Sequence, residues 1–255
     1  MAVLLRHREN SVEILTLNRP DQRNSLSPEL LEELSAALEE AENSGEIRVV
    51  ILTAAGDKAF CAGMDLKAFA AGSDDRKPRS TKHFEAFIEG RFPKPIIAAV
   101  NATAVAGGFE LMMSCDLAVV AESAKFGIPE VKRGLFAAGG GVLLPARIPL
   151  AIALELGLTG EPIDAARAYQ LGLVNRVVKA EAVIPTALEL AQKIAANGPL
   201  GVAITKKLMW ACAETGAGAT RSLLKASIDP VFKSEDAVEG ARAFAEKRTP
   251  QWRGR

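Results

Sequence analysis

The sequence predicts an α/β fold that is followed by a helical C-terminal region. Over the first two-thirds of the chain, short apolar and β-branched runs of strand length alternate with amphipathic helical patterns. Two of these runs, 49–52 and 96–100, are apolar throughout, which is typical of strands covered on both faces by helices. From about residue 182 onward the patterns are helical only. We therefore expect an α/β core over 1–198 and a helical region over 199–255 that serves in oligomerisation.

Composition narrows the class of protein. The 255 residues are 49% hydrophobic and carry 31 basic and 31 acidic side chains, so no net charge draws the chain to nucleic acid or to an anionic membrane. No apolar run reaches the ~18 residues of a membrane span, and the N-terminus enters a strand pattern without a signal-peptide pattern, which predicts a cytoplasmic protein. Three distant cysteines and two histidines argue against a disulfide framework and against a structural zinc site.

The N-terminal elements have clear boundaries. Val3–His7 and Val12–Leu17 are expected to form a β-hairpin. Ser27, with a proline directly after it, is a good helix cap, and the apolar face of that helix continues until Gly45. The buried strand Val49–Leu52 comes next. These signals predict a strand–strand–helix–strand order.

The central stretch predicts a strand that leads into a helix through glycines. Ile96–Val100 is the strand, Gly107 and Gly108 form the turn, and helical spacing follows from Phe109. Such a turn leaves backbone N–H groups unpaired at the helix start, where the helix dipole favours negative charge. Glu110 lies in the first helical turn among apolar neighbours. A lone buried acid has a raised pKa or a dedicated partner, so we expect a functional site here.

The remaining elements are expected as follows. The polar, Gly- and Pro-broken stretch 70–82 is predicted to be a mobile loop or lid, followed by a short helix at His83–Ile88. Beyond the central helix we expect strands at Leu117–Ala121, Ala124–Phe126 and Val174–Val178, and helices at Val142–Arg147, Ala151–Leu158, Ile163–Leu171 and Ser234–Lys247.

Two glycine-containing turns, 61–66 and 106–108, each follow a predicted strand. If their free N–H groups converge on one oxygen, they form an oxyanion hole that stabilises the enolate of a thioester. Read separately, each is an ordinary tight turn. Neither matches a nucleotide-binding motif.

Glu110 and Glu130 form a candidate pair of acids. Both have apolar or small neighbours, and their sequence separation of 20 allows one intervening strand to bring the second acid beside the first. Two carboxyl groups in one pocket have pKa values that are pushed apart, as paired acid–base catalysis requires. The alternative, in which Glu130 caps its turn or pairs with Lys132 or Arg133, stays open on composition alone.

Taken together, these stretches resemble the enoyl-CoA hydratase/isomerase (crotonase) superfamily over essentially the whole chain. The resemblance rests on several motifs in matching order, namely Asn18-Arg19-Pro20 with Asn24-Ser25-Leu26, residues 60–66, residues 94–101, Gly107 to Glu110 with Cys115-Asp116, Phe126 to Glu130, and Leu158-Thr159-Gly160 with Gly172-Leu173-Val174. It implies a crotonase-like spiral of ββα repeats with a C-terminal helical trimerisation region, assembled as a homotrimer or a dimer of trimers.

The resemblance also implies the ligand. The expected partner is an acyl-CoA thioester, and no separate cofactor is expected because the substrate itself carries CoA. No metal site, nucleic-acid partner or membrane partner is expected.

Site residues follow from the matching positions. The resemblance assigns Met64 and Gly107 as backbone oxyanion donors, Glu110 as the group that activates water, and Glu130 as the group that delivers a proton. The positions that match CoA contacts are Arg23, Ala62, Asp65 and Leu66, together with Phe244 and Lys247 from a neighbouring subunit.

The leading expectation is an enoyl-CoA hydratase, which reversibly adds water to a trans-2-enoyl-CoA. One alternative is a Δ3,Δ2-enoyl-CoA isomerase, which can work with a single acid–base group. Another is a non-catalytic acyl-CoA-binding protein, since fold does not fix function. Small residues such as Ala102, Ala104, Ala137 and Ala138 permit a roomy acyl pocket, so the sequence leaves the acyl group open.

Overall fold

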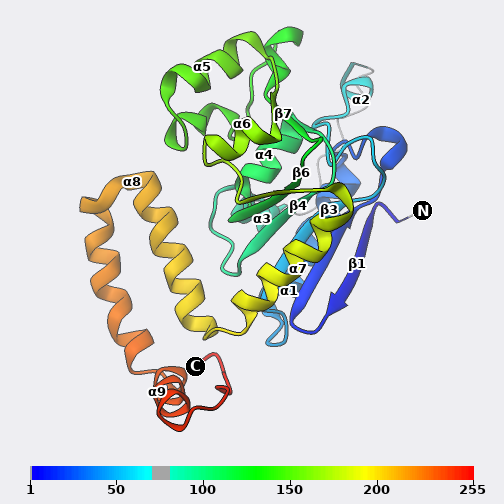
Figure 1. Ribbon diagram of the computed structural model, residues 1–255. Coiled ribbons are helices and arrows are strands. Elements are labelled where there is room, and N and C mark those ends of the chain that lie inside the picture. The colour runs from blue at the N-terminus through cyan, green and yellow to red at the C-terminus, as the bar shows by residue number, and fades with distance from the viewer. Residues whose placement is uncertain (1, 71–80) are drawn as a thin grey trace.

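The computed structural model describes residues 2–70 and 81–255 (Figure 1). Most of the predicted lid therefore lies outside the described residues. At its edges, Ala70 ends a short helix, α2 (Leu66–Ala70), and Lys82 begins α3 (Lys82–Ile88). Among the described residues, no helix is both long and apolar enough to span a bilayer.

A six-stranded sheet forms the centre of the protein, in the order β1-β2-β3-β4-β6-β9. The predicted hairpin is confirmed, because β1 and β2 pair antiparallel, and every later neighbour in the sheet is parallel. The strands are β1 (Leu4–Glu9), β2 (Val12–Leu17), β3 (Val49–Ala54), β4 (Ile96–Val100), β6 (Leu117–Ala121) and β9 (Arg176–Val178).

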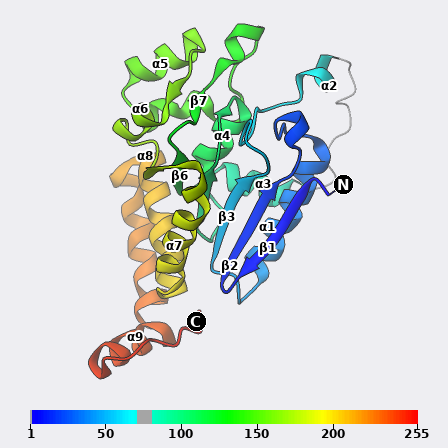
Figure 2. The same ribbon diagram turned by 45° about the vertical axis from the view of Figure 1, so that its right-hand side comes forward.

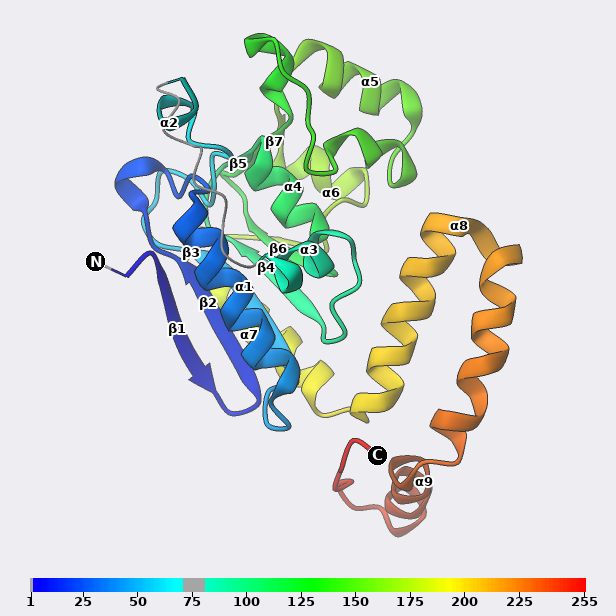
Figure 3. The same cartoon turned by 180° about the vertical axis from the view of Figure 1, so that it is seen from behind.

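Helices cover both faces of this sheet. All residues of β3 and β4 are buried, as the continuous apolar runs predicted. The helix α7 (Val183–Ala195) lies over one face, while α1 (Pro28–Asn43), α3 and α4 (Gly107–Ser114) lie on the other (Figures 1 and 3). The predicted cap of α1 is present, since the Ser27 side chain accepts a hydrogen bond from Leu30 N.

A second, small sheet carries the segments that enter the candidate site. It contains β5 (Ala104–Val105), β7 (Lys125–Gly127) and β8 (Ile163–Asp164), in the order β5-β7-β8. Sequence analysis did not predict β5, because a two-residue strand of small side chains has no periodic pattern. The turn at Gly107 thus follows β5 rather than directly following β4. The strands expected at 117–121 and 124–126 are present as β6 and β7, and both lie between Glu110 and Glu130.

Two predicted helices differ from the structure. The segment expected as a helix at Val142–Arg147 is a 3-10 helix, η3 (Gly141–Ala146), and α5 (Leu150–Thr159) follows it. The expected helix Ile163–Leu171 begins as β8, and only Ala165–Gln170 (α6) is helical. The reason is the Asp164 side chain, which caps α6 by accepting a hydrogen bond from Arg167 N and so starts the helix two residues later.

The C-terminal helices project from the core (Figures 1 and 2). α8 (Pro199–Phe232) turns sharply at Gly216, where φ is 80° and ψ is 164°, and α9 (Glu235–Glu246) follows. No residue of α8 is buried in the single chain. Its main polar anchor is Asp116, which accepts hydrogen bonds from Lys206 Nζ and Trp210 Nε1, both at 2.7 Å.

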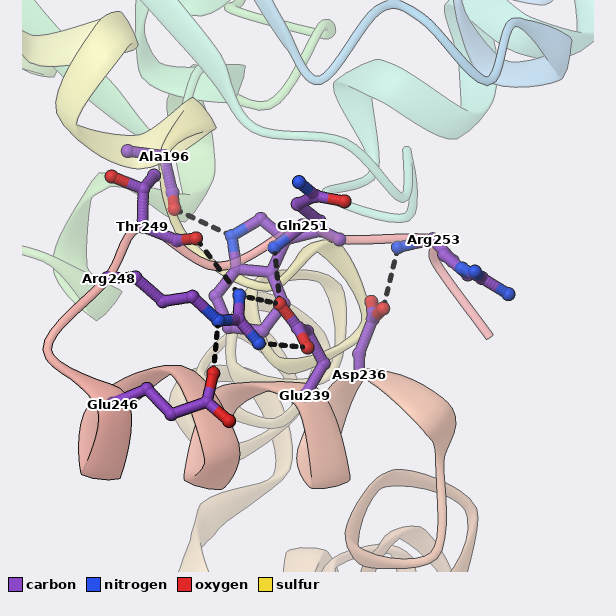
Figure 4. Close-up of polar contacts among 9 residues, drawn as sticks. Ala196, Asp236, Glu239, Glu246, Arg248, Thr249, Gln251 and Arg253 are labelled. Atoms are coloured by element: carbon purple, nitrogen blue, oxygen red, sulfur yellow. Dashed lines mark hydrogen bonds and ion pairs between the residues drawn. The ribbon is translucent and has the colours of Figure 1, made fainter.

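The end of the chain is fastened to α9 and to the end of α7 (Figure 4). Arg248 donates two hydrogen bonds to the Glu239 carboxylate, at 2.7 and 2.9 Å, and these contacts lower the pKa of Glu239 to about 2. Trp252 Nε1 donates to Ala196 O at 2.7 Å, just beyond the last residue of α7. The segment after α9 is therefore an ordered part of the C-terminal region.

Candidate active site

The two glycine-containing turns meet directly. Gly63 has a φ of +81°, and a Cβ atom placed on it would lie 2.7 Å from Ala106 Cβ and 2.8 Å from Gly107 N. Val105 N donates to Cys61 O at 3.1 Å, and Cys61 also bridges to Ala104. Only a glycine at position 63 allows this approach, so the first turn is packed against the start of α4.

Unpaired N–H groups lie where the turns meet. Gly107 is the first residue of α4, so its N–H has no carbonyl within the helix, and Ala106 supplies no side-chain cap. Within residues 2–70 and 81–255, the N–H of Met64 makes no hydrogen bond, and the residue is 40% exposed. The structure therefore brings both residues of the predicted oxyanion hole to the same junction, with donor groups free for a ligand.

The backbone at this junction is strained. Ala106 has φ 53° and ψ −135°, a conformation that residues with a Cβ rarely adopt and that costs about 1–3 kcal/mol. Next to it, a Cβ on Gly108 would lie only 2.0 Å from Cys61 O. The surrounding contacts impose this geometry, and strain of this kind is common where backbone groups serve a ligand.

Glu110 is buried, with 7% exposure, and the backbone holds its carboxylate. Oε1 accepts a hydrogen bond from Gly141 N at 2.8 Å, and Gly139 N also donates to the carboxylate. Burial raises the pKa of Glu110, and these two backbone contacts partly oppose the rise. Sequence analysis did not assign these donors. The signal in the sequence was the run of three glycines at 139–141. At Gly139 and at Gly141 a Cβ atom would collide with the Glu110 side chain.

Glu130 lies close enough to Glu110 to feel its charge. It belongs to the 3-10 turn η2 (Pro129–Arg133), and its Oε2 atom is buried without a hydrogen-bond partner among the described residues. Burial raises its pKa, a hydrogen bond from its own backbone N–H partly opposes the rise, and the nearby charge of Glu110 raises the pKa further, while Arg133 lowers it. Lys132 pairs instead with Glu161. The structure thus brings the two acids together and gives Lys132 another partner.

The residues matched to CoA contacts in the first turn share one surface. Arg23 is exposed, and its carbonyl accepts a hydrogen bond from Ala62 N at 3.1 Å. The carboxylate of Asp65 lies 3.7 Å from the guanidinium of Arg19, and the exposed Leu66 begins α2. These residues flank Met64, so a ligand that reached the free N–H groups would pass along them.

Asn24 is buried next to Arg23 and stabilises the segment that contains it, a role that sequence analysis did not assign. Its side chain is fully buried, and Nδ2 donates to Ala55 O at 2.9 Å and to Ala59 O at 2.8 Å. Its Oδ1 accepts a hydrogen bond from Arg19 N at 2.8 Å. One amide thus links the segment that contains Arg23 to the turn after β3. Asn24 has a φ of 52°, which asparagine tolerates better than most residues.

A single chain does not bring Phe244 and Lys247 to the two acids. Phe244 lies on α9 and is 88% exposed, and Lys247 ends that helix. In all three ribbon views α9 lies at the opposite end of the molecule from α4 (Figures 1 to 3). Contact between these residues and a ligand at Glu110 requires a second copy of the chain.

The comparisons with known proteins can be set against this geometry. A family model described as Enoyl-CoA hydratase/isomerase matches residues 7–255. The chain belongs to the enoyl-CoA hydratase/isomerase family. The resemblance found in the sequence is therefore confirmed, and with it the crotonase superfamily.

Relatives and solved structures of this family match the whole chain. The chain is 43% identical to enoyl-CoA hydratase EchA19 of Mycobacterium tuberculosis, over 95% of this chain and 93% of that protein. It is 40% identical to carnitinyl-CoA dehydratase of Citrobacter koseri, over 94% of each chain. The crystal structure of enoyl-CoA hydratase EchA1 from Mycobacterium marinum superimposes with a TM-score of 0.91 at 43% identity, and all of both chains is covered. The crotonase fold is confirmed.

Proposed function

We propose that the protein is an enoyl-CoA hydratase, which reversibly adds water to a trans-2-enoyl-CoA to give a 3-hydroxyacyl-CoA. The observation that carries the proposal is the closeness of Glu110, beside the start of α4 at Gly107, to Glu130, with free N–H groups at Met64 and Gly107. An isomerase needs one acid–base group, whereas hydration uses two. The proposal also draws support from family membership.

The site residues would act as follows. The N–H groups of Met64 and Gly107 donate hydrogen bonds to the thioester oxygen and stabilise the enolate that forms when C3 is attacked. Glu110, oriented by Gly141, takes one proton from water while the water oxygen bonds to C3. Glu130 gives its proton to C2. The product gains one OH and one H, and the pair keeps a single proton, which has moved from Glu130 to Glu110.

The raised pKa values suit this exchange. Desolvation favours the neutral form of each carboxyl group, and the charge of Glu110 favours a protonated Glu130. A pair that holds one proton between its members can act as base and acid in the same turnover. Proton transfer back from Glu110, through solvent, would restore the starting state.

A second candidate activity is dehydration of a carnitinyl-CoA. Carnitinyl-CoA dehydratases are among the relatives at 38–40% identity, and both reactions move water across a CoA thioester. The two candidates differ in the acyl group, since the carnitinyl group carries a permanent positive charge. A comparison of crotonyl-CoA, a long-chain enoyl-CoA, a ring-bearing enoyl-CoA and carnitinyl-CoA as substrates would separate them.

We also propose a homo-oligomer, either a trimer or a dimer of trimers. Two apolar stripes with four-residue spacing support it, because each lies along one helix face and is exposed in the single chain. On α5 the stripe is Leu150, Leu154 and Leu158, and on α8 it is Leu224, Ile228 and Phe232. Light scattering on the purified protein tests the proposal, and a monomer in solution would contradict it.

The test of the activity follows the ultraviolet absorbance of the conjugated enoyl thioester, with wild type beside Glu130→Gln. Hydration that is lost in the variant supports the proposal, because acid–base groups contribute about 10²- to 10⁴-fold. Product formed in ¹⁸O-labelled water should carry the label at C3. An unlabelled product with a moved double bond would indicate the isomerase, and acyl-CoA binding without turnover would indicate a non-catalytic protein.

A further inference from the structure

We propose that Gly160 is a positioning residue for Glu130, because the 3-10 turn that contains this acid packs directly against Gly160. The proposal rests on the hydratase function proposed above, but it concerns a residue in a different element. Gly160 follows the last residue of α5 and ends that helix with a φ of +64°. It lies outside the turns that form the rest of the site.

The contact between Gly160 and the turn is direct. A Cβ on Gly160 would lie 3.1 Å from Pro129 Cα, 3.1 Å from Lys132 Cε and 3.2 Å from Lys132 Cγ. Pro129 immediately precedes Glu130, so the nearest obstacle is main chain next to the acid. A flexible lysine side chain can move aside, but the Cα of a proline cannot move without moving the turn.

Other contacts hold the same two segments together. Lys132 pairs with Glu161, and Phe126 pairs with Ile163 between β7 and β8. A Cβ on Gly127 would lie 3.1 Å from Pro162 Cα. The segment 126–132 therefore contacts the segment 160–164 at several positions, and Gly160 contacts the residue that directly precedes Glu130.

The acid itself needs this support. The Oε2 atom of Glu130 has no hydrogen-bond partner among the described residues, whereas Glu110 is fixed by Gly141 N at 2.8 Å. Glu110 belongs to α4 and takes its donors from 139–141, whereas the atoms nearest to a Cβ on Gly160 belong to Pro129 and Lys132. A side chain added at position 160 would thus move Glu130 relative to Glu110 and relative to the oxyanion donors.

The expected kinetic effect is specific. Misplacement of a reacting group by about 1 Å can cost about 10²-fold in rate. We expect Gly160→Ala to lower kcat by about 30- to 100-fold and to leave KM within about threefold, because the atoms nearest to the new Cβ belong to the turn of Glu130 and not to the surface formed by 23 and 62–66.

Gly172→Ala is the matched control. Gly172 ends its own helical segment with a φ of +76°, but no atom lies within 4 Å of a Cβ placed there. Both substitutions force alanine into the left-handed region, and only the one at Gly160 pushes on the turn of Glu130. The control should lose a similar amount of thermal stability and keep kcat within about twofold. Equal losses of kcat in the two variants would overturn the proposal.

A second readout does not depend on turnover. In protein labelled with ¹³C at the glutamate carboxyls, the Glu130 signal can be assigned by its loss in Glu130→Gln, and its titration midpoint can be compared among variants. The midpoint should move in Gly160→Ala and stay in place in Gly172→Ala; an unmoved midpoint in Gly160→Ala would refute the positioning role. If wild type hydrates no enoyl-CoA, the proposed function fails while this measurement still decides the role of Gly160.

If alanine at 160 prevents folding, asparagine at both positions repeats the comparison. Asparagine tolerates the left-handed region and still carries a Cβ. Gly160→Asn and Gly172→Asn therefore reduce the backbone penalty and keep the difference in contact. The same kcat difference and the same shift of the Glu130 midpoint are expected, and their absence contradicts the proposal.

Discussion

The two acids of the candidate site lie in unlike surroundings. Glu110 is in the first turn of a regular α-helix, is 7% exposed, and has its carboxylate held by the backbone of 139–141. Glu130 lies in a 3-10 turn, and one of its oxygens is buried with no partner in the described part of the chain. Buried polar atoms are rarely left unpaired, so an unpaired one at a site is a natural place for a ligand or water atom.

This difference suggests different tasks for the two carboxyl groups. A carboxylate that accepts backbone hydrogen bonds is stabilised in its charged form, which suits a base with a fixed direction. A carboxyl group with one buried oxygen that has no donor, near a second negative charge, favours its neutral form more and can give a proton. The surroundings therefore support the roles proposed for Glu110 and Glu130, in that order.

The largest expected effect comes from substituting both acids. Glu110→Gln and Glu130→Gln should each lower kcat for hydration by about 10²- to 10⁴-fold. If the two acids work in one step, the double variant should be little worse than the poorer single variant, because groups that act as a unit are not additive. If the kcat loss of the double variant equalled the product of the two single losses, each acid would act independently. That result would contradict the proposal that the two acids work in one step.

A smaller effect should follow when the donor to Glu110 is disturbed. A Cβ on Gly141 would lie 2.5 Å from Ala137 Cβ and 3.1 Å from Glu110 Oε1, so Gly141→Ala should displace the N–H that holds the carboxylate. We expect kcat to fall about 10- to 100-fold, with the pKa of Glu110 raised further as this donor is lost.

Gly140→Ala is the control for that experiment. Gly140 has a φ of +114°, but a Cβ there would meet nothing within 4 Å. Its backbone penalty should lower the melting temperature without a comparable loss of kcat. If both variants lost kcat equally, the loop as a whole rather than the donor to Glu110 would be responsible.

Sequence patterns were sufficient for the large elements and for the residue types at the site. The continuous apolar runs at β3 and β4 and the Ser27 cap have local causes, so the sequence carries them directly. The pairing of Glu110 with Glu130 was proposed from residue chemistry, and both strands predicted between them are present. Isolated acids among apolar neighbours are unusual enough to be noticed without a structure.

Features that depend on close approach between distant segments could not be predicted in the same way. Three such features depend on one or two small residues each. They are the donors to Glu110 from 139–141, the strand β5, and the contact of Gly160 with the turn of Glu130. A glycine has no side-chain pattern, and its reason for being present is the atom that a Cβ would strike, which lies elsewhere in the sequence. The support from Asn24 is of the same kind, since its acceptors follow 31 and 35 residues later.

Stability should depend on pH through these acids. Burial raises the pKa of Glu110 above the value of 4.5 for the free group, so between these two values the native protein holds more protons than the unfolded chain. The free energy of unfolding therefore falls as pH rises through that window, and the contribution is fully present only below it.

The melting temperature of Glu110→Gln relative to wild type reports this effect. The variant cannot ionise, so the difference between variant and wild type should grow in favour of the variant as pH rises from 4 to 8. Each kcal/mol corresponds to about 2–4 °C for a protein of this size. A difference that does not change with pH would mean that Glu110 titrates alike in the native and unfolded states.

The smallest effect is expected at the oxyanion donors, where the main chain rather than the side chain would act. Met64 is 40% exposed, and its N–H is the group proposed to meet the thioester oxygen. Met64→Ala keeps that N–H, so kcat should stay within about threefold of wild type, whereas loss of a true oxyanion donor costs about 10²- to 10³-fold. Hydration assays on this variant beside Glu130→Gln make the contrast, and similar losses in both would contradict the division between backbone donors and side-chain acids.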